Sequence, residues 1–141
     1  MSLGRIGGVY AALHAGSQVA DYWGQTNDQA ETKGKPGRDG RAACARHVAT
    51  LTATQALFLG LAATLSGERL QGRRVVAGLA LNAATHYWAD RRFTLEGLAD
   101  RLECIGKGDY YRAGGAPHLD QAFHTGVCAL AAMVIGGGSK G

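Results

Sequence analysis

Two segments rich in glycine and proline limit what this chain can fold into. They are KGKPGRDG at residues 33–40 and IGKGDYYRAGGAP at residues 105–117, and both have the composition of loops. The long stretches around them repeat apolar residues at helical spacing, and none alternates polar with apolar residues as a strand does. The sequence therefore predicts an all-α fold. We expect helices over residues 6–31, 40–65, 68–91, 95–104 and 118–135.

These elements predict a compact bundle of four principal helices plus one short helix. A chain of 141 residues has room for one hydrophobic core, so residues 1–135 are expected to form a single domain. The last six residues, GGGSKG at 136–141, have the composition of a flexible tail. Hydrophobic residues make up 46% of the chain, aromatic residues only 7%, and there are 22 glycines. We therefore expect a core rich in small residues, with closely packed helices.

Two polar residues are expected to begin helices. Asp39 precedes the second predicted helix, where its carboxylate could accept hydrogen bonds from free amides of the first turn. Thr94 stands in the same position before the short helix. Gly97 occupies the place where a capping box needs Glu or Gln, so Thr94 is expected to act as a simple cap.

The sequence predicts a cytoplasmic protein and leaves membrane association as an alternative. The N-terminal stretch has no convincing export signal, because His14 and polar residues interrupt it. Residues 48–65 are about long enough to span a bilayer, but four threonines and Gln55 within them fit a buried core helix equally well. The cysteines are odd in number and have no close-pair spacing, which indicates free thiols in a reducing compartment: Cys44, Cys104 and Cys128.

Ionisable residues recur at helical spacing inside these apolar stretches. His86 and Asp90 are four residues apart on one predicted helix, and Asp120 and His124 repeat that spacing on another. A separation of four places both side chains on one face of a helix. His47 lies on the second predicted helix. A further polar stripe lies on the first: His14, Gln18, Asp21 and Gln25.

Histidine and carboxylate groups on separate helices are how helical bundles assemble metal sites. Neutral imidazole and carboxylate are good ligands for zinc, manganese or iron, and burial of several such groups without a cation would be costly. We therefore expect a divalent metal ion at a shared centre. Each pair alone could also be a local ion pair on its helix, and His14 alone is better explained as a hydrogen-bonded core residue.

Four strings of the sequence, taken in order, resemble an uncharacterised bacterial and phage family called domain of unknown function 3307. They are HAGSQVADYWGQTNDQAETKG, RHVATLTATQAL, THYWADRR and HLDQAFH, and they extend from His14 to His124. The residues that match the family's motifs are Asp21, Gln25, Lys33, His47, His86, Asp90, Asp120, Gln121 and His124. The resemblance implies a helical, often membrane-associated protein with a site at these residues, and it names no reaction.

Together these patterns predict a metal-dependent hydrolase that acts on an anionic, phosphorylated substrate. Five residues are expected to hold the ion: His47, His86, Asp90, Asp120 and His124. Asp21 is expected to act as a general base or to bind a second ion. Three cations are expected to neutralise the substrate: Lys33, Arg91 and Arg92.

Two other functions remain open at this point. One is a helical protein without enzymatic activity, whose buried His/Asp network fixes the register of its helices; its location on a membrane or in a phage–host complex is left open. The other is nucleic-acid binding through the basic segment at residues 33–46. We consider it the poorer alternative, because the basic residues are few and no recognised nucleic-acid-binding motif accompanies them.

Overall fold

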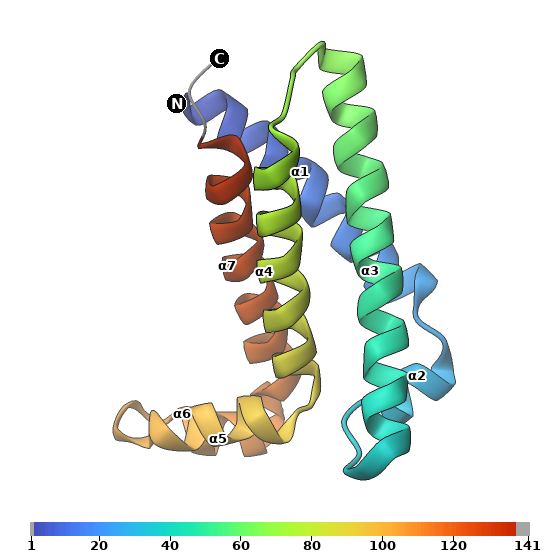
Figure 1. Cartoon of the computed structure of the whole chain (residues 1–141). Coiled ribbons are helices and arrows are strands. Elements are labelled where there is room, and N and C mark those ends of the chain that lie inside the picture. The colour runs from blue at the N-terminus through green and yellow to red at the C-terminus, as the bar shows by residue number, and fades with distance from the viewer. Residues whose placement is uncertain (1, 138–141) are drawn as a thin grey trace.

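The computed structural model describes residues 2–137, and the described chain is helical and has no strand. Four helices form the bundle: α1 (Leu3–Val19), α3 (Gly37–Ser66), α4 (Gly72–Asp90) and α7 (Ala116–Gly136). Three shorter ones gather at one end of it: α2 (Asn27–Thr32), α5 (Phe93–Arg101) and α6 (Lys107–Tyr110). The helices α5 and α6 run across that end of the bundle rather than along it (Figure 1). The prediction of an all-α bundle is confirmed, although the described chain has three short helices rather than one.

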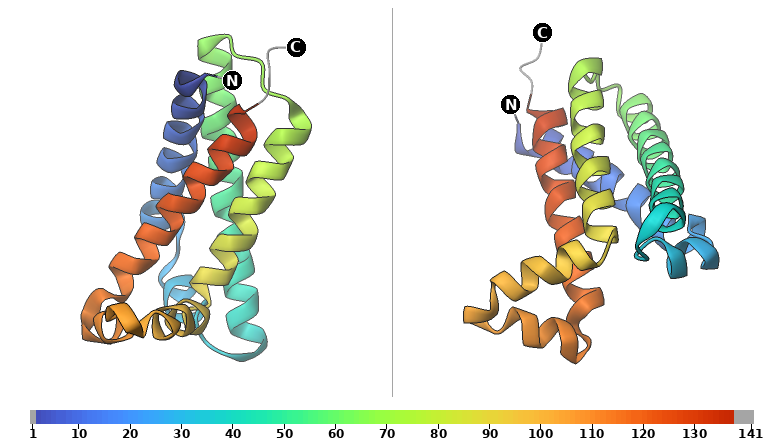
Figure 2. Two further views of the ribbon diagram at one scale, coloured as in Figure 1. Left: turned by 90° about the vertical axis from the view of Figure 1, so that its left-hand side faces the viewer. Right: turned by 60° about the horizontal axis from the view of Figure 1, so that its bottom comes forward.

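The core lies where α1, α3, α4 and α7 come together. Its buried side chains include Leu13 of α1, Leu59 of α3 and Ile135 of α7. Glycines let the helices approach closely, because a Cβ at Gly16 would lie within 2.8 Å of the Gln55 backbone. The views in Figure 2 show α7 packed between α1 and α4 along the length of the bundle. The prediction of a core rich in small residues therefore describes this interior.

The first predicted helix is broken in the structure. A π-helical turn at Ala20–Gly24 follows α1, and Gln25 is extended before α2 begins. Thr26 and Gln29 form a capping box that starts α2, in which the Thr26 hydroxyl accepts a hydrogen bond from the backbone N–H of Gln29 at 3.2 Å. The spacing Thr-x-x-Gln is the signal that the prediction of one long helix over residues 6–31 overlooked.

Both predicted N-caps are wrong. Helix α3 begins at Gly37, so Asp39 lies inside its first turn. A carboxylate at that position still stabilises the helix, because it lies near the positive end of the helix dipole. Helix α5 begins at Phe93, after Arg92 with a φ of 57°, and Thr94 lies inside that helix. The Thr94 hydroxyl donates instead to the backbone carbonyl of Trp88, which joins α5 to the end of α4.

The segment at residues 105–117, predicted as a loop, is mostly helical. It contains α6 and a second π-helical turn at Tyr111–Gly115, and α7 begins within it. The chain changes direction at Gly106 and Gly114, whose φ values of 71° and 100° suit glycine. The predicted tail also differs at its start, since Gly136 ends α7. Residues 138–141 of that tail lie outside the described residues.

One layer of buried polar side chains crosses the middle of the bundle, and we call it the glutamine layer. Each of the four long helices contributes one residue to it: Ser17, Gln55, Asn82 and Cys128. The Gln55 amide donates to the Ser17 hydroxyl at 2.7 Å, and the Asn82 amide donates to the Gln55 carbonyl oxygen at 2.8 Å. Among the described residues, no side-chain nitrogen or oxygen of this layer is buried without a partner.

Candidate metal centre

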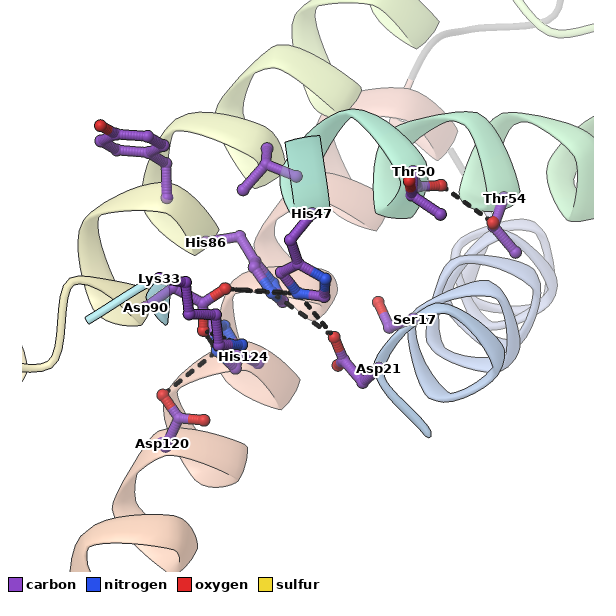
Figure 3. Close-up of polar contacts among 12 residues, drawn as sticks. Ser17, Asp21, Lys33, His47, Thr50, Thr54, His86, Asp90, Asp120 and His124 are labelled. Atoms are coloured by element: carbon purple, nitrogen blue, oxygen red, sulfur yellow. Dashed lines mark hydrogen bonds and ion pairs between the residues drawn. The ribbon is translucent and has the colours of Figure 1, made fainter. Parts of the chain in front are cut away.

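A second layer of buried polar side chains lies one to two helical turns from the glutamine layer. It consists of Asp21, His47, His86, Asp90 and His124, which we call the His/Asp centre. His86 and Asp90 belong to α4, His47 to α3 and His124 to α7, while Asp21 lies in the π-helical turn that continues α1. Figure 3 shows these side chains pointing toward one another. The centre is thus assembled from elements that are distant in sequence.

Three atoms of the centre form an almost equilateral triangle. The Nε2 atoms of His47 and His86 are 3.2 Å apart, and each lies 3.3 Å from Oδ2 of Asp90. Ligands that bind zinc at about 2.0–2.1 Å in tetrahedral geometry are separated by about 3.3–3.4 Å. These three side chains therefore fit three positions of a tetrahedral metal site.

Asp21 approaches the same histidine pair. Its Oδ1 atom lies 3.2 Å from Nε2 of His47 and 3.6 Å from Nε2 of His86. These three atoms also lie close enough together to hold one metal ion. The structure therefore places Asp21 among the potential ligands, whereas sequence reasoning gave it first the role of a base.

His124 and Asp120 lie at the outer side of the centre. His124 belongs to a second group that could hold an ion, with His86 and Asp90, and its ring stacks on His86 at 3.8 Å. Its Nε2 atom is nevertheless closer to Oδ1 of Asp120, at 3.3 Å, than to Oδ1 of Asp90, at 3.7 Å. Asp120 contacts the centre only through His124 and is 29% exposed, so the geometry does not place it among the ligands.

The electrostatics of the centre keep one carboxylate charged. Burial alone would raise the pKa of Asp90, but the close imidazoles of His124 and His86 and the charge of Lys33 hold it well below its ordinary value. The Lys33 Nζ atom lies 2.8 Å from Oδ1 of Asp90. Asp90 is therefore a carboxylate at neutral pH, with Oδ2 left to face the two histidines.

The two stacked histidines differ in protonation. Burial lowers the pKa of His86, and its contact with Asp90 only partly offsets this, so its imidazole is neutral. Burial also disfavours the charged form of His124, but Asp120 and Asp90 outweigh it and raise its pKa to about 9. A neutral imidazole is the form that binds a metal, so His86 is the better ligand of the two.

Several buried polar atoms of the centre have no hydrogen-bond partner. They include both carboxylate oxygens of Asp21, Oδ2 of Asp90, Nδ1 of His47 and Nε2 of His124. Such atoms are rare in folded proteins, because each costs about 1–3 kcal/mol when it is left unpaired. The carboxylate oxygens of Asp21 and Asp90 converge on the histidine pair without a hydrogen-bond donor, and a cation would satisfy them, so the donor set fits a divalent metal ion.

No family model, curated protein or solved structure matches this chain. Support for a function therefore comes from the geometry of the His/Asp centre and its surroundings.

A cavity of about 420 Å³ opens beside the centre. Asp21, Asp90 and His124 face it, whereas His47 and His86 are not among its lining residues. Its other walls supply cations, aromatic rings and amides: Lys33, Arg92, Tyr22, Tyr111, Gln25 and Gln121. The two histidines that would anchor an ion therefore lie behind two carboxylates that a ligand in the cavity could reach.

Arg91 is not available to this cavity, which corrects the role expected from the sequence. Its guanidinium is buried and donates to the backbone carbonyls of Lys33 and Lys35, at 2.8 and 2.6 Å. Arg91 therefore holds the turn that carries Lys33. Arg92 does line the cavity, while donating to the carbonyl of Ala30 at 2.7 Å.

The polar stripe predicted on the first helix divides in the structure. His14 stacks on Tyr10 with ring centroids 5.6 Å apart and takes no part in the centre. Ser17, one residue before Gln18, is the side chain that faces the glutamine layer. Sequence reasoning missed Ser17 because serine occurs in every structural context, and it missed Tyr22 and Tyr111 as cavity residues because nothing in the sequence brings their segments together.

Proposed function

We propose that this protein is a metal-dependent hydrolase that acts on an anionic, phosphorylated substrate. The observation that carries the proposal is the His47, His86 and Asp90 triangle, whose edges match a tetrahedral site, beside a cavity with cationic walls. Catalytic metal sites keep one coordination position open for water or substrate. Here the carboxylates of the centre face the cavity, so a ligand of the ion could enter from that side.

Separate residues of the chain would bind the metal and the substrate. His47, His86 and Asp90 would hold the ion, and Asp21 would add a further oxygen from the cavity side, where room remains for water or substrate. When bound, a divalent ion supplies a Lewis acid and lowers the pKa of water. Lys33 and Arg92 stand on the cavity wall, where a phosphoryl group would meet positive charge.

The ligand set favours zinc, manganese or iron. Two imidazole nitrogens with carboxylate oxygens suit these ions, whereas magnesium and calcium prefer sets made of oxygen alone. None of the potential ligands is a thiol. Cys44 is buried against the carbonyl of Tyr87, and burial raises its pKa to about 11, so its thiol stays protonated.

Metal analysis and a hydrolysis assay test this proposal together. The protein is purified without a His-tag, its metal content is measured, and it is assayed on p-nitrophenyl phosphate and bis-p-nitrophenyl phosphate with chelator and with added zinc, manganese or iron. We expect about one ion bound per chain and activity that chelation removes and the metal restores. Protein that binds none of these ions would contradict the proposal.

A matched pair of variants makes the test specific. His86→Ala removes one corner of the triangle, and His14→Ala removes a histidine of the same bundle that lies away from the centre. We expect His86→Ala to lose both metal and activity and His14→Ala to keep both. Equal losses in the two variants would indicate general unfolding rather than a site.

A further inference from the structure

In the half of the bundle away from the His/Asp centre, all four helices have long uncharged stretches, and the charged residues of these helices, Arg5, Arg73 and Arg74, lie only at its far end. No Asp, Glu, Lys or Arg occurs at residues 6–20, 47–67, 75–89 or 121–136. A helix at the surface of a water-soluble bundle normally carries charged and polar residues on its outer face. The uncharged half therefore lacks the charged outer face that is typical of helices in contact with water.

The large exposed side chains in this half are apolar. Leu57, Leu61 and Leu65 follow one another at helical spacing on α3 and are 59%, 52% and 87% exposed. Leu130 and Met133 of α7 are each 54% exposed. The most apolar stretch of α3 is only 22% buried inside the protein, although a core helix of a soluble protein is mostly buried. This helix and the helical stretch at residues 107–136 are long and apolar enough to cross a membrane.

The residues that flank the uncharged half differ at its two ends. The exposed aromatic residues all lie at the end with the His/Asp centre: Tyr22, Trp23, Trp88, Phe93 and Tyr110. At the other end stand four arginines: Arg5, Arg69, Arg73 and Arg74. Tyrosine and tryptophan collect at membrane surfaces, and arginine side chains can extend from a helix end to lipid phosphates. Both ends therefore match the chemistry of a bilayer surface.

We propose that this uncharged half lies in the hydrocarbon core of a lipid bilayer. Residues 6–20, 48–66, 75–85 and 125–136 would be embedded, and the His/Asp centre would lie outside them, at the membrane surface. The α3 segment is about 28 Å long at 1.5 Å per residue, close to the 30 Å of a bilayer core. The embedded segments of α1, α4 and α7 are only about 17–23 Å long at 1.5 Å per residue, so the bilayer would have to thin around them, with the flanking arginines extending to its surface. The helices α5 and α6 then lie along the membrane surface (Figure 1).

The distribution of positive charge sets the orientation. Of the 15 Lys and Arg residues, Lys140 lies outside the described residues and four arginines lie at the far end, which leaves ten at the end with the His/Asp centre. Short loops rich in Lys and Arg remain on the cytoplasmic side. The centre therefore faces the cytoplasm. This inference is independent of the proposed hydrolase activity, because it uses a different part of the molecule.

Fractionation of bacterial cells that express the full chain tests the insertion. We expect the protein to float with membranes in a density gradient, to resist extraction by alkaline carbonate and to require detergent for release. Folded protein in the soluble fraction would overturn the proposal, and so would protein that pellets without lipid. A second copy of the chain or a protein partner covering the apolar face would leave the protein extractable by carbonate, and that outcome also overturns the proposal.

Two lysine substitutions sharpen this test. Leu57→Lys places a charge near the middle of the embedded part of α3, and Leu102→Lys places one at the membrane surface, where Leu102 is 41% exposed. We expect Leu57→Lys to lose most of the floating protein and Leu102→Lys to float like the parent chain. In a soluble protein, both would be tolerated surface changes, so a Leu57→Lys protein that is folded and unchanged in its fractionation would contradict insertion.

Cysteine labelling tests the orientation. Cys104 is exposed at the end with the His/Asp centre, whereas Cys44 and Cys128 are buried. In spheroplasts, a membrane-impermeant maleimide should leave Cys104 unlabelled until lysis. In a Cys104→Ser background, Glu68→Cys at the far end, outside the embedded segments, should be labelled before lysis. The reverse pattern would overturn the cytoplasmic placement of the centre.

Discussion

Two layers of polar side chains cross the same bundle, one to two helical turns apart, and they differ in how their polar atoms are satisfied. In the glutamine layer, Ser17, Gln55 and Asn82 are linked by hydrogen bonds of 2.7 and 2.8 Å. In the His/Asp centre, both oxygens of Asp21 and one of Asp90 accept no hydrogen bond. A satisfied network stabilises and specifies a core, whereas an unsatisfied one is costly. The comparison indicates that the first layer serves the fold and the second serves a ligand.

The largest expected effect is on the glutamine layer. Gln55→Ala should lower the free energy of unfolding by about 3–5 kcal/mol, because it leaves a cavity and removes the partners of Ser17 and Asn82. Chemical denaturation measures this loss. Metal content should not change in the folded fraction of Gln55→Ala, and a protein that loses its metal along with its stability would show that the two layers are one unit.

Chelation should have the next largest effect, and on the other layer alone. A ligand that binds only the native state stabilises it by about 2.7 kcal/mol at a concentration 100 times its Kd. We therefore expect chelation to lower the Tm of the parent protein but to leave the Tm of His86→Ala unchanged. Thermal melts with and without chelator provide the measurement. An equal drop in both proteins would mean that the chelator acts elsewhere.

The variants of the two aspartates at the edge of the centre should differ by about tenfold in their affinity for the metal. Asp21→Asn removes a carboxylate 3.2 Å from His47, whereas Asp120→Asn changes a group that meets the centre only through His124. Titration of the metal-free variants with zinc compares them. We expect weaker binding for Asp21→Asn and nearly parental binding for Asp120→Asn. The opposite order would restore Asp120 as the ligand that the sequence suggested.

A related expectation concerns the metal-free state. Without an ion, Asp21 is an acceptor that no donor satisfies, so Asp21→Asn should leave the metal-free Tm unchanged or raise it. A purely structural His/Asp network predicts instead a loss of about 3–5 kcal/mol when one member of a buried pair is removed. Melts of the metal-free proteins distinguish the two roles of the centre.

The smallest expected effect on activity is at Lys33. Lys33→Met removes the charge that lies 2.8 Å from Asp90 on the cavity wall. We expect KM for a phosphoester to rise several-fold while kcat changes less, because the interaction is made with bound substrate as well as with the transition state. Steady-state kinetics of Lys33→Met and of a Lys35→Met control, whose side chain does not line the cavity, would test this.

Helical periodicity predicts which residues of one helix share a face, but it does not predict how the helices bring these residues together. A spacing of four residues places His86 beside Asp90 whatever the rest of the chain does, and the structure has these atoms 3.3 Å apart. The same spacing joins Asp120 to His124. Periodicity says nothing about how far each helix extends past its neighbours, so it could not predict that Asp21 reaches the histidines while Asp120 remains outside.

Long-range contacts account for the other differences. Arg91 follows Asp90 directly, and only the fold shows that its guanidinium is used by the carbonyls of Lys33 and Lys35. The break after α1 depended on a local signal, the Thr26 and Gln29 capping box, and could have been predicted. The helical structure at residues 105–117 could not, since glycines at Gly106 and Gly114 permit a loop and a kinked helix equally.

The arginine that holds the Lys33 turn makes a distant glycine indispensable. A Cβ at Gly40 would overlap the carbonyl of Lys35, which is one of the two acceptors of Arg91. Any side chain at this position would push the turn off its arginine and carry Lys33 away from Asp90. In a library of variants selected for activity, position 40 should therefore tolerate as little change as the ligands themselves, although it has no chemistry of its own.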